Sequence, residues 1–350
     1  MKRIISLILC LITPLSVTLT SCTIFTGDED ADLVITTERG SEFKIVQFAD
    51  LHFGEEGTQY HNYDETRTIE FMDYVVKTEN PDLIVLSGDN IMNTGVVGAK
   101  ELIDIMDSFQ TPYTFVFGNH DATTYTPSFS KRDVSLLLES SNSPYLLYKS
   151  GYIETTAENR YGNFSILLKD SATGNLLGAF IIIDTGIYDY SISAYQSITE
   201  GQIGWYKGEI ARLNEIYTKQ KNNAMEVIPT ITYGHIQLTD HFLAYKKAVE
   251  NDGAEFLYYQ ELGGWMQGVM QDSASSNSSP FFDAMREMKS SKAYICGHMH
   301  GMRFHVKTDG IVLGFCPQTG STSSSQRPFN TFVYTLDEQF EMTIRLVSEQ

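Results

Sequence analysis

The sequence predicts an α/β fold with parallel strands, and three neighbouring segments support this prediction. Residues 43–50, FKIVQFAD, form a short apolar run that ends in an acid. Residues 63–80 place apolar side chains at helical spacing, and residues 81–90, PDLIVLSGDN, form a second apolar run after a proline. A strand, a helix and a strand in this order indicate a parallel pair joined by a crossover helix.

The first residues of the chain have the pattern of a secretory signal. A basic start precedes an apolar run from Ile4 to about Leu19, which a proline interrupts. Residues 19–22, LTSC, resemble the bacterial lipoprotein lipobox, in which cleavage exposes a cysteine that becomes acylated. The resemblance implies a signal peptide over residues 1–21, lipidation of Cys22, and an exported, extracytoplasmic protein that is lipid-anchored to the cell membrane. Ordinary signal cleavage near a chance cysteine is the alternative.

An acidic stretch follows this signal. Residues 27–32 read GDEDAD, which is typical of a solvated segment. We therefore expect an acidic tether over residues 22–40 and a single folded domain over residues 41–350. With 350 residues and 42% apolar content, the chain is long enough to bury a sizeable core.

The first three predicted strands each end in a polar cluster. A helix expected over residues 99–109 leads to the third strand, within residues 112–121, PYTFVFGNHD. Ligands of open α/β sheets lie outside the carboxyl ends of the strands. We therefore expect one rim to hold Asp50, His52, Asp89, Asn119 and His120.

Two later segments repeat this pattern. Residues 225–238, MEVIPTITYGHIQL, contain a strand that ends before His235, and residues 292–300, KAYICGHMH, end in His298 and His300. In an extended segment, residues i and i+2 point to the same face, roughly 6–7 Å apart, so the last two imidazoles could converge on one site. Glycines before four of these polar clusters would let the backbone turn sharply. Five strand ends with such side chains indicate a metal site.

Together the motifs resemble the five signatures of the calcineurin-like metallophosphoesterase superfamily. They are Asp50-Leu51-His52, Gly88-Asp89, Gly118-Asn119-His120-Asp121, Gly234-His235 and Gly297-His298-Met299-His300. The match spans about Phe43 to Gly320, and the chain is most similar to the branch that neighbours purple acid phosphatases. The resemblance implies a four-layer αββα sandwich of mixed sheets, with a dinuclear metal site at the carboxyl-terminal edge of the strands.

The resemblance also implies ligands for two metal ions. It assigns Asp50, His52 and His300 to the first metal, assigns Asn119, His235 and His298 to the second, and makes Asp89 the bridge. Nitrogen and oxygen ligands without thiolate fit Mn, Fe, Zn or Co, as divalent or trivalent ions, better than Ca or Mg. Two dications and two carboxylates leave a formal excess of about +2, which would attract a phosphate.

Two further residues have expected catalytic roles. The resemblance places His120 beside the substrate, as a general acid or as a group that stabilises the phosphate. Asp121 would orient that imidazole, although an equally good interpretation has it fixing the loop backbone. The implied mechanism is direct attack on phosphorus by a metal-bridging hydroxide, without a covalent enzyme intermediate.

The sequence departs from the family pattern at three positions. Purple acid phosphatases carry a metal-binding tyrosine three residues after the bridging aspartate, where this chain has Met92. They also usually lack the histidine of the first motif, whereas His52 is present here. Gln237 stands where relatives often have proline, which bears on the shape of the substrate rim rather than on a ligand.

Charge narrows the expected partners. The chain has 44 acidic and 25 basic residues, a formal net charge of −19, which would repel nucleic acid. We expect hydrolysis of small or surface phosphomonoesters, membrane contact through the lipid anchor, and no nucleic-acid partner. The alternatives are a phosphodiesterase on the same site and a catalytically silent surface-binding lipoprotein. The sequence does not indicate an oligomeric state.

Several other residues leave alternatives open. Cys296 and Cys316 follow strand-like runs and could form one disulfide, although two buried free thiols fit the sparse cysteine content better. We expect either surface positions or substrate contacts for His61 and His241, and a structural role for His305. The aromatic- and glycine-rich stretch 236–280 is expected to be irregular, either a functional lid or a satellite core.

Overall fold

The computed structural model describes most of the chain. The described residues are 32–54, 64–92, 94–122, 129–155, 160–191, 193–221, 226–260, 278–320 and 329–349. The expected signal peptide, Cys22, the acidic segment up to residue 31 and His61 lie outside them, as do residues 261–277 of the expected lid. Within the described residues, no helix has both the length and the apolar character needed to cross a membrane.

A five-stranded mixed sheet carries the first three motifs. Its order is β15-β14-β2-β3-β4. The strands are β2 (Phe43–Phe48), β3 (Leu83–Ser87), β4 (Tyr113–Val116), β14 (Asn330–Leu336) and β15 (Met342–Ser348). Strands β2, β3 and β4 run parallel, and β14 pairs antiparallel with both β2 and β15, so the carboxyl ends of β2, β3 and β4 meet at one edge.

Helices follow the three parallel strands of this sheet, and the ends of α1 carry capping residues. They are α1 (Glu65–Glu79) and α2 (Val96–Ser108), and α3 (Lys131–Glu139) follows β4. The side chain of Asp64 accepts a hydrogen bond from the backbone N–H of Arg67 and caps α1, which ends at Asn80 in the left-handed conformation. The strand–helix–strand prediction over residues 43–90 is therefore confirmed.

An eight-stranded mixed sheet carries the last two motifs. Its order is β1-β5-β6-β9-β11-β13-β12-β10. The strands are β1 (Leu33–Thr37), β5 (Phe164–Asp170), β6 (Leu176–Ile182), β9 (Thr230–Tyr233), β10 (Phe256–Tyr259), β11 (Ser291–Cys296), β12 (Phe304–Thr308) and β13 (Ile311–Phe315). Strands β9 and β11 are parallel neighbours, so the loops after them lie at the same edge.

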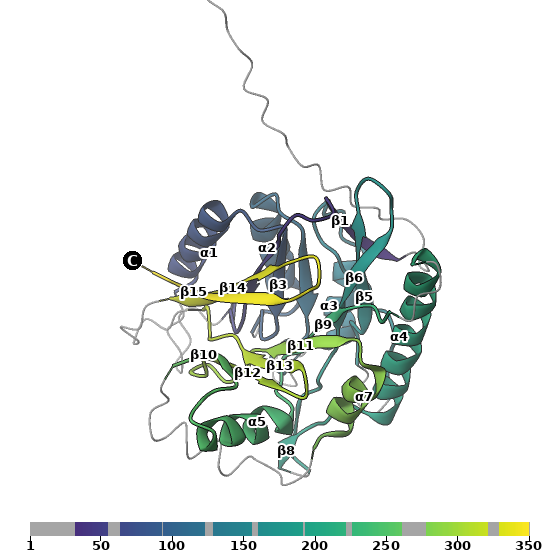
Figure 1. The fold of residues 1–350 in the computed structure, drawn as a ribbon. Coiled ribbons are helices and arrows are strands. Elements are labelled where there is room, and N and C mark those ends of the chain that lie inside the picture. Colours follow the sequence, from purple (N-terminus) through teal and green to yellow (C-terminus); the bar gives the residue numbers. More distant parts are fainter. Residues whose placement is uncertain are drawn as a thin grey trace, which may run out of the picture.

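The two sheets pack face to face between two layers of helices (Figure 1). Across the inner interface, the rings of Phe43 on β2 and Phe180 on β6 stack with 5.6 Å between their centroids. Helices α4 (Glu200–Gln220), α5 (Thr239–Glu250) and α7 (Pro280–Met288) cover the outer face of the eight-stranded sheet. The predicted four-layer αββα sandwich is confirmed.

Three sequence-based expectations need correction or refinement. Residues 33–37 were expected to belong to the tether, but they form β1 and pair in parallel with β5, so the folded body begins before residue 41. Part of the stretch expected to be irregular forms α5 and β10. Cys296 and Cys316 are free, buried thiols, as the sparse cysteine content favoured.

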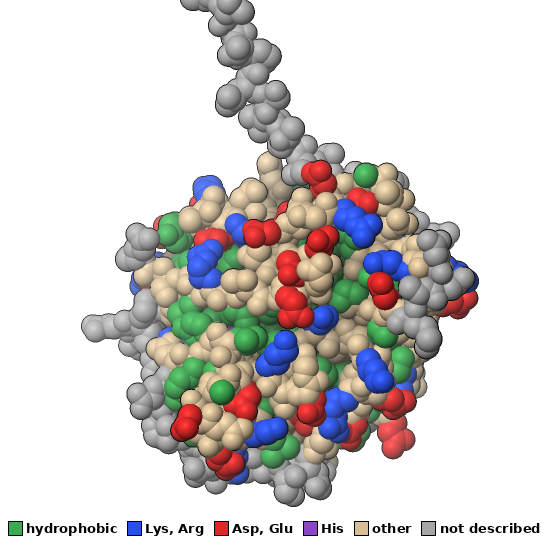
Figure 2. Space-filling view, in the orientation of Figure 1, with side chains coloured by type: hydrophobic (Ala, Val, Ile, Leu, Met, Phe, Trp, Pro, Cys, Tyr) green, Lys and Arg blue, Asp and Glu red, His purple; other side chains and the backbone are tan. Residues whose placement is uncertain are grey.

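The visible surface mixes both signs of charge. On the face drawn in Figure 2, acidic and basic side chains alternate with apolar ones, and none of the described histidines shows there. This face therefore does not carry a field of a single sign. A phosphate would have to be attracted by charges placed locally, at the edge where the described motifs meet.

Candidate metal centre

Backbone hydrogen bonds join the loops after β2 and β3, and likewise the loops after β9 and β11. The N–H of Asp50 donates to the carbonyl of Gly88 at 3.0 Å, and the N–H of His52 donates to that of Asp89 at 2.9 Å. On the second sheet, the N–H of Gly297 donates to the carbonyl of His235 at 3.1 Å. Strand pairing therefore continues past the strand ends and fixes the polar side chains that follow.

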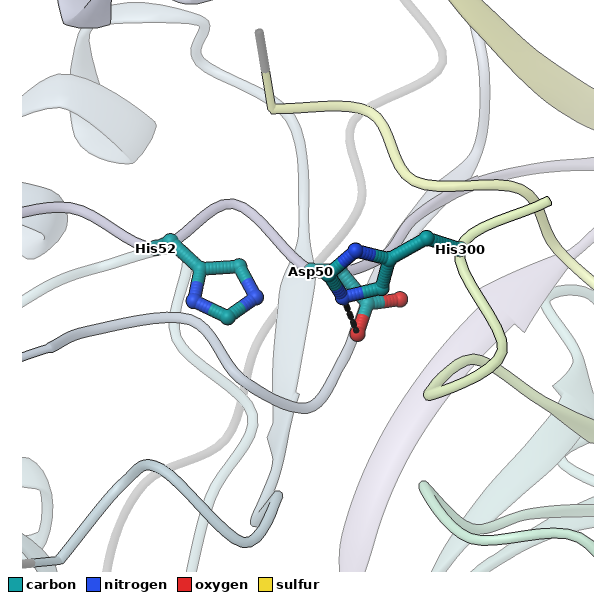
Figure 3. Close-up of side chains that lie close together, drawn as sticks. All are labelled: Asp50, His52 and His300. Carbon is teal, nitrogen blue, oxygen red and sulfur yellow. Dashed lines mark ion pairs between the residues drawn. The ribbon is translucent and has the colours of Figure 1, made fainter. Parts of the chain in front are cut away.

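Asp50, His52 and His300 form a first group of potential ligands. One ligand atom from each lies within 4.8 Å of the others. Nε2 of His300 is 3.3 Å from Oδ1 of Asp50, and Figure 3 shows this ion pair with His52 beside it. Asp50 and His52 are buried, whereas 42% of the His300 side chain is exposed, so this group opens toward solvent on one side.

Asp89, His235 and His298 form a second group with the same compactness. Nε2 of His235 lies 3.1 Å from Oδ2 of Asp89. Nδ1 of His235 lies 2.9 Å from the carbonyl oxygen of Ser87, which directs Nε2 into the group. A backbone carbonyl therefore orients the ligand atom of this histidine.

The carboxylate of Asp89 connects the two groups. Its Oδ2 lies 3.1 Å from Nε2 of His235 and 4.0 Å from Nε2 of His52, which belong to different groups. Its Oδ1 accepts the backbone N–H of His120 at 2.7 Å. From this position Asp89 would help to hold a metal ion in each group.

Asn119 supplies an oxygen that the protein itself does not use. Its Oδ1 is buried and makes no hydrogen bond with the described residues. A buried, unpaired carbonyl oxygen is costly, so its presence indicates a ligand that the polypeptide does not provide. The chemistry of the residues therefore fits a metal ion beside Asn119.

The backbone at the site is held in an uncommon conformation. Asp50, His52, Asp89 and His298 have φ angles of 53°, 53°, 50° and 66°, in the left-handed region that non-glycine residues rarely adopt. Such conformations persist only where the surrounding structure imposes them, and they gather at functional sites. Four of the seven proposed ligand residues share this feature.

Close packing explains the motif glycines better than sharp turns do. Gly88 has a φ of +95°, as a turn would require, but a Cβ there would also lie 2.4 Å from Nδ1 of His235. Gly118 has no positive φ, yet a Cβ there would lie 2.1 Å from the backbone nitrogen of Asp89. The glycines let the loops of different strands approach one another, which refines the expected role.

The ionisation of these groups follows from burial and charge. Burial alone would lower the pKa of His235, but the carboxylates of Asp89 and Asp50 raise it to about 9. Burial lowers the pKa of His52 to about 3 and, together with the nearby His235, that of His298 to about 4. In the protein alone, a proton on His235 thus balances buried carboxylates, a role that a bound cation would take over.

His120 lies beside both groups without belonging to either. Its Nε2 is 3.9 Å from Oδ2 of Asp89, and its ring centroid is 5.4 Å from that of His52. Because 42% of its side chain is exposed, it can reach a ligand that enters from solvent. His120 therefore lies at the rim of the two groups, and its expected catalytic role stays a prediction.

The described hydrogen bonds of Asp121 agree with the second of its two expected roles, fixing the loop backbone. Oδ1 accepts the backbone N–H groups of Asn90 and Ile91, each at 2.9 Å, and Oδ2 accepts that of Gly118 at 2.7 Å. None of its described hydrogen bonds reaches His120. Burial and the charge of Asp89 raise the pKa of Asp121 to about 6. The side chain ties the loop after β4 to the loop after β3.

Three contacts at the site escaped sequence reasoning. Sδ of Met92 lies 3.3 Å from Nδ1 of His52, so the residue that replaces the family tyrosine still touches the site. The N–H of Thr319 donates to the carbonyl of Ala49 at 2.8 Å and braces the loop before Asp50. The ring of Tyr195 packs on His298 with 4.4 Å between centroids. Only the density of tyrosines around residue 190 could have indicated the last contact.

The two remaining histidines among the described residues, His241 and His305, are structural. His241 is fully buried, with Nδ1 3.2 Å from the carbonyl oxygen of Leu238, so the expected surface or substrate-contact position was wrong. Burial lowers its pKa to about 3. His305 is also buried, with Nε2 3.1 Å from the hydroxyl of Tyr334, which confirms its expected structural role.

Comparisons with known proteins show the family of the chain. A family model described as calcineurin-like phosphoesterase matches residues 43–302, the segment that contains all the residues of both groups. The chain belongs to the calcineurin-like phosphoesterase family. Membership of this family supports a phosphoesterase-type hydrolase. Members of the family typically contain a dinuclear metal site.

Individual relatives share less than 30% of their residues with this chain. The chain is 28% identical over 299 residues to "Probable inactive purple acid phosphatase 29" of Arabidopsis thaliana, covering 78% of this chain and 70% of that protein. It is 24% identical over 336 residues to "Probable inactive purple acid phosphatase 14" of the same plant, covering 86% and 76%. A crystal structure of a dimetal phosphatase from Danio rerio aligns with a TM-score of 0.48 at 11% identity, covering 88% of this chain and 99% of that one.

Proposed function

We propose that the chain is an active, metal-dependent phosphoesterase that hydrolyses phosphomonoesters. The observation that supports this most strongly is the completeness of the site. Two compact groups of carboxylate and imidazole ligands lie side by side, and Asp89 reaches both. A module that only bound a partner would need neither the second group nor the exposed His120.

The residues of the two groups would hold two ions of Mn, Fe, Zn or Co. The first ion would be held by Asp50, His52 and His300, the second by Asn119, His235 and His298, and both by Asp89. When bound, the ions supply positive charge for phosphoryl oxygens and acidify water to a nucleophile at neutral pH. The identity of the ions is a matter for metal analysis of the purified protein.

His120 would act on the ester itself. Its backbone N–H is fixed by Asp89, and its half-exposed ring can donate a hydrogen bond to a phosphoryl oxygen or a proton to the leaving oxygen. Such proton transfer contributes typically about 10²- to 10⁴-fold to a rate. Asp121 supports this by holding the loop of Asn119 and His120 against the loop of Asp89.

A catalytically silent binding protein is the competing function, because two relatives carry names that call them probably inactive. The described site argues for activity in this chain. Met92 replaces the family tyrosine, but His52 adds a ligand-type group in contact with it. The chain thus lacks the tyrosine ligand of purple acid phosphatases at Met92 but has an imidazole, that of His52, next to this position.

We also propose that the protein is exported and held at a membrane by acyl chains on Cys22. The support is the amino-terminal sequence, with its basic start, apolar run and LTSC motif. Cys22→Ala should move the protein from the membrane fraction to the soluble fraction, as measured by immunoblotting after fractionation. Unchanged membrane retention of the variant would defeat this part of the proposal.

The activity is tested with protein that lacks residues 1–22, loaded with Mn or Zn. We expect it to hydrolyse p-nitrophenyl phosphate faster than bis(p-nitrophenyl) phosphate, and His120→Ala to lose about 10²-fold or more of that rate. A higher rate on the bis-ester would make the enzyme a phosphodiesterase. No turnover of either ester by metal-loaded protein would favour the silent binding protein.

A further inference from the structure

A small tyrosine-bearing hairpin stands beside the second ligand group. It consists of β7 (Tyr188–Asp189) and β8 (Ala194–Tyr195), which pair antiparallel and belong to neither large sheet. An isolated two-stranded hairpin is marginally stable in water. Contacts with the rest of the protein must therefore hold it.

Arg160 supplies much of this support from a buried position. The residue is only 4% exposed, and its guanidinium donates to the carbonyl of Ser197 at 2.8 Å, to Oε1 of Gln202 at 2.7 Å and to Oε1 of Gln196 at 3.2 Å. The backbone of Gln196 also donates to the carbonyl of Ile187 at 3.0 Å. The base of the hairpin is thus tied to the core by charge-assisted hydrogen bonds.

The same hydrogen-bond network continues to residues that flank β5 and β6 of the eight-stranded sheet. Nε2 of the fully buried Gln202 donates to Oδ1 of Asn163 at 2.8 Å and to the carbonyl of Asp184 at 2.7 Å. Lys131 pairs with the Asp184 carboxylate at 2.5 Å and donates to the carbonyl of Gly186 at 3.2 Å. The segment that enters the hairpin is therefore held from both sides, so its tyrosines are preorganised.

The tyrosine rings form a continuous aromatic surface that leads away from the metal centre. Tyr195 packs edge-to-face on His298 with 4.4 Å between centroids, Tyr188 packs on Tyr195 at 5.1 Å, and Tyr190 packs on Tyr188 at 5.0 Å. Tyr195 is 41% exposed and Tyr190 is 80% exposed, whereas Tyr188 between them is partly buried. Aromatic side chains left so exposed beside a reactive site provide a stacking surface for a ligand.

We propose that this tyrosine row, Tyr188, Tyr190 and Tyr195, binds a planar aromatic group of the phosphoester. The inference rests on the proposed function and specifies its substrate class: an aryl phosphate or a nucleotide whose phosphate lies at the ligand groups. A planar aromatic group can pack offset or edge-to-face on these rings, whereas an aliphatic alcohol offers no π-face. The tyrosine row is thus the specificity-determining element of the site.

The test measures kcat/KM for p-nitrophenyl phosphate, adenosine 5′-monophosphate and glycerol 2-phosphate. The variants are Tyr195→Ala, Tyr190→Ala and Tyr195→Phe, and the matched control is Tyr74→Ala, since Tyr74 on α1 is 38% exposed and belongs to neither the site nor the hairpin. Loss of one stacked ring should lower kcat/KM for the aromatic esters about five- to fiftyfold, mainly through KM. Tyr74→Ala should stay within about twofold, and Tyr195→Phe, which keeps the aromatic ring, should lose clearly less than Tyr195→Ala.

The pattern over substrates decides the outcome. We expect glycerol 2-phosphate to change less than about twofold in every variant, and the aromatic ester that is affected more tells whether a simple aryl group or a nucleobase is bound. Equal losses for aromatic and aliphatic esters in Tyr195→Ala would overturn the inference, because Tyr195 would then act only through His298. The metal content of each variant, measured in parallel, reports such an indirect effect.

A binding measurement keeps this test separate from the question of activity. Benzylphosphonate and butylphosphonate carry a carbon–phosphorus bond that a phosphoesterase does not hydrolyse. In calorimetric titrations of the metal-loaded protein, benzylphosphonate should bind about fivefold or more tightly than butylphosphonate, and Tyr195→Ala should remove the difference. Equal affinities in the unmodified protein would overturn the inference even if the enzyme were active, and a difference would support it even if no ester were hydrolysed.

Discussion

His298 and His300 are separated by one residue yet belong to different ligand groups. His298 joins Asp89 and His235, whereas His300 pairs with Asp50. The strand ends at Cys296 and His298 has a positive φ, so loop geometry and not strand alternation divides the pair between the groups. Met299 between them packs against the apolar core on the outer face of the eight-stranded sheet.

This division predicts separate effects on two metal ions. His298→Ala should weaken binding of one ion, and His300→Ala should weaken binding of the other, because each loses a ligand from a different group. Metal content by mass spectrometry after dialysis should fall toward one ion per chain in each variant, with Met299→Leu as the matched control that keeps two. Loss of both ions in both histidine variants would show that the two groups do not bind independently.

Asp121 and His120 are neighbours with opposite expected effects. Asp121→Asn replaces one carboxylate oxygen by an NH₂ group that faces backbone N–H donors, so the free energy of unfolding should fall by about 1–3 kcal/mol. His120→Ala removes a side chain that is 42% exposed, so stability should change by less than about 0.5 kcal/mol while activity falls. Urea unfolding of both metal-free variants checks this contrast. Equal stability losses would contradict it.

At the scale of elements, a buried ion pair connects α3 to the end of β6. Nζ of Lys131 lies 2.5 Å from Oδ1 of Asp184, and these side chains are 6% and 0% exposed. The pair holds the segment that leads to the tyrosine hairpin. The main role of this ion pair is therefore to position that segment, because buried ion pairs contribute little net stability compared with well-packed apolar groups.

Breaking this pair on one side should be costly. Lys131→Met leaves the Asp184 carboxylate buried without its cation, which should lower the free energy of unfolding by about 3–5 kcal/mol. The double variant Lys131→Met/Asp184→Leu should recover a large part of that loss, because no unpaired charge remains. A double variant as unstable as the sum of both single variants would show that packing, and not the unpaired charge, sets the cost.

The sequence predicted some elements well and others poorly for physical reasons. Apolar runs between prolines and glycines indicated β2, β3, β4, β9 and β11, because both faces of these strands are buried. The ligand residues could be named because they follow such runs directly. The positive φ angles of Asp50 and His52 and the contact of Tyr195 with His298 could not, since long-range packing imposes them.

At the scale of the whole molecule, the ligand groups join the two sheets. Asp50, Asp89 and Asn119 come from loops of the five-stranded sheet, whereas His235, His298 and His300 come from loops of the eight-stranded sheet. Each group contains residues from both sheets. Bound ions would therefore connect the sheets at the edge where the cores end.

Metal removal should accordingly destabilise the fold. An ion at about 100 times its dissociation constant adds about 2.7 kcal/mol per site to the free energy of unfolding if it does not bind the unfolded chain. Chelation should remove this gain, and His300→Ala should show roughly half of it, as measured by urea unfolding with and without metal. Identical unfolding curves for loaded and chelated protein would contradict the proposed placement of the ions.

The most direct test of the proposed activity is a titration of metal-free protein with Mn or Zn while hydrolysis of p-nitrophenyl phosphate is followed. The two ligand groups and the shared Asp89 predict that turnover rises mainly over the second equivalent and reaches its limit at two ions per chain. Asp89→Ala should show no such rise. Full turnover at one equivalent, or none at any metal load, would contradict a dinuclear phosphoesterase.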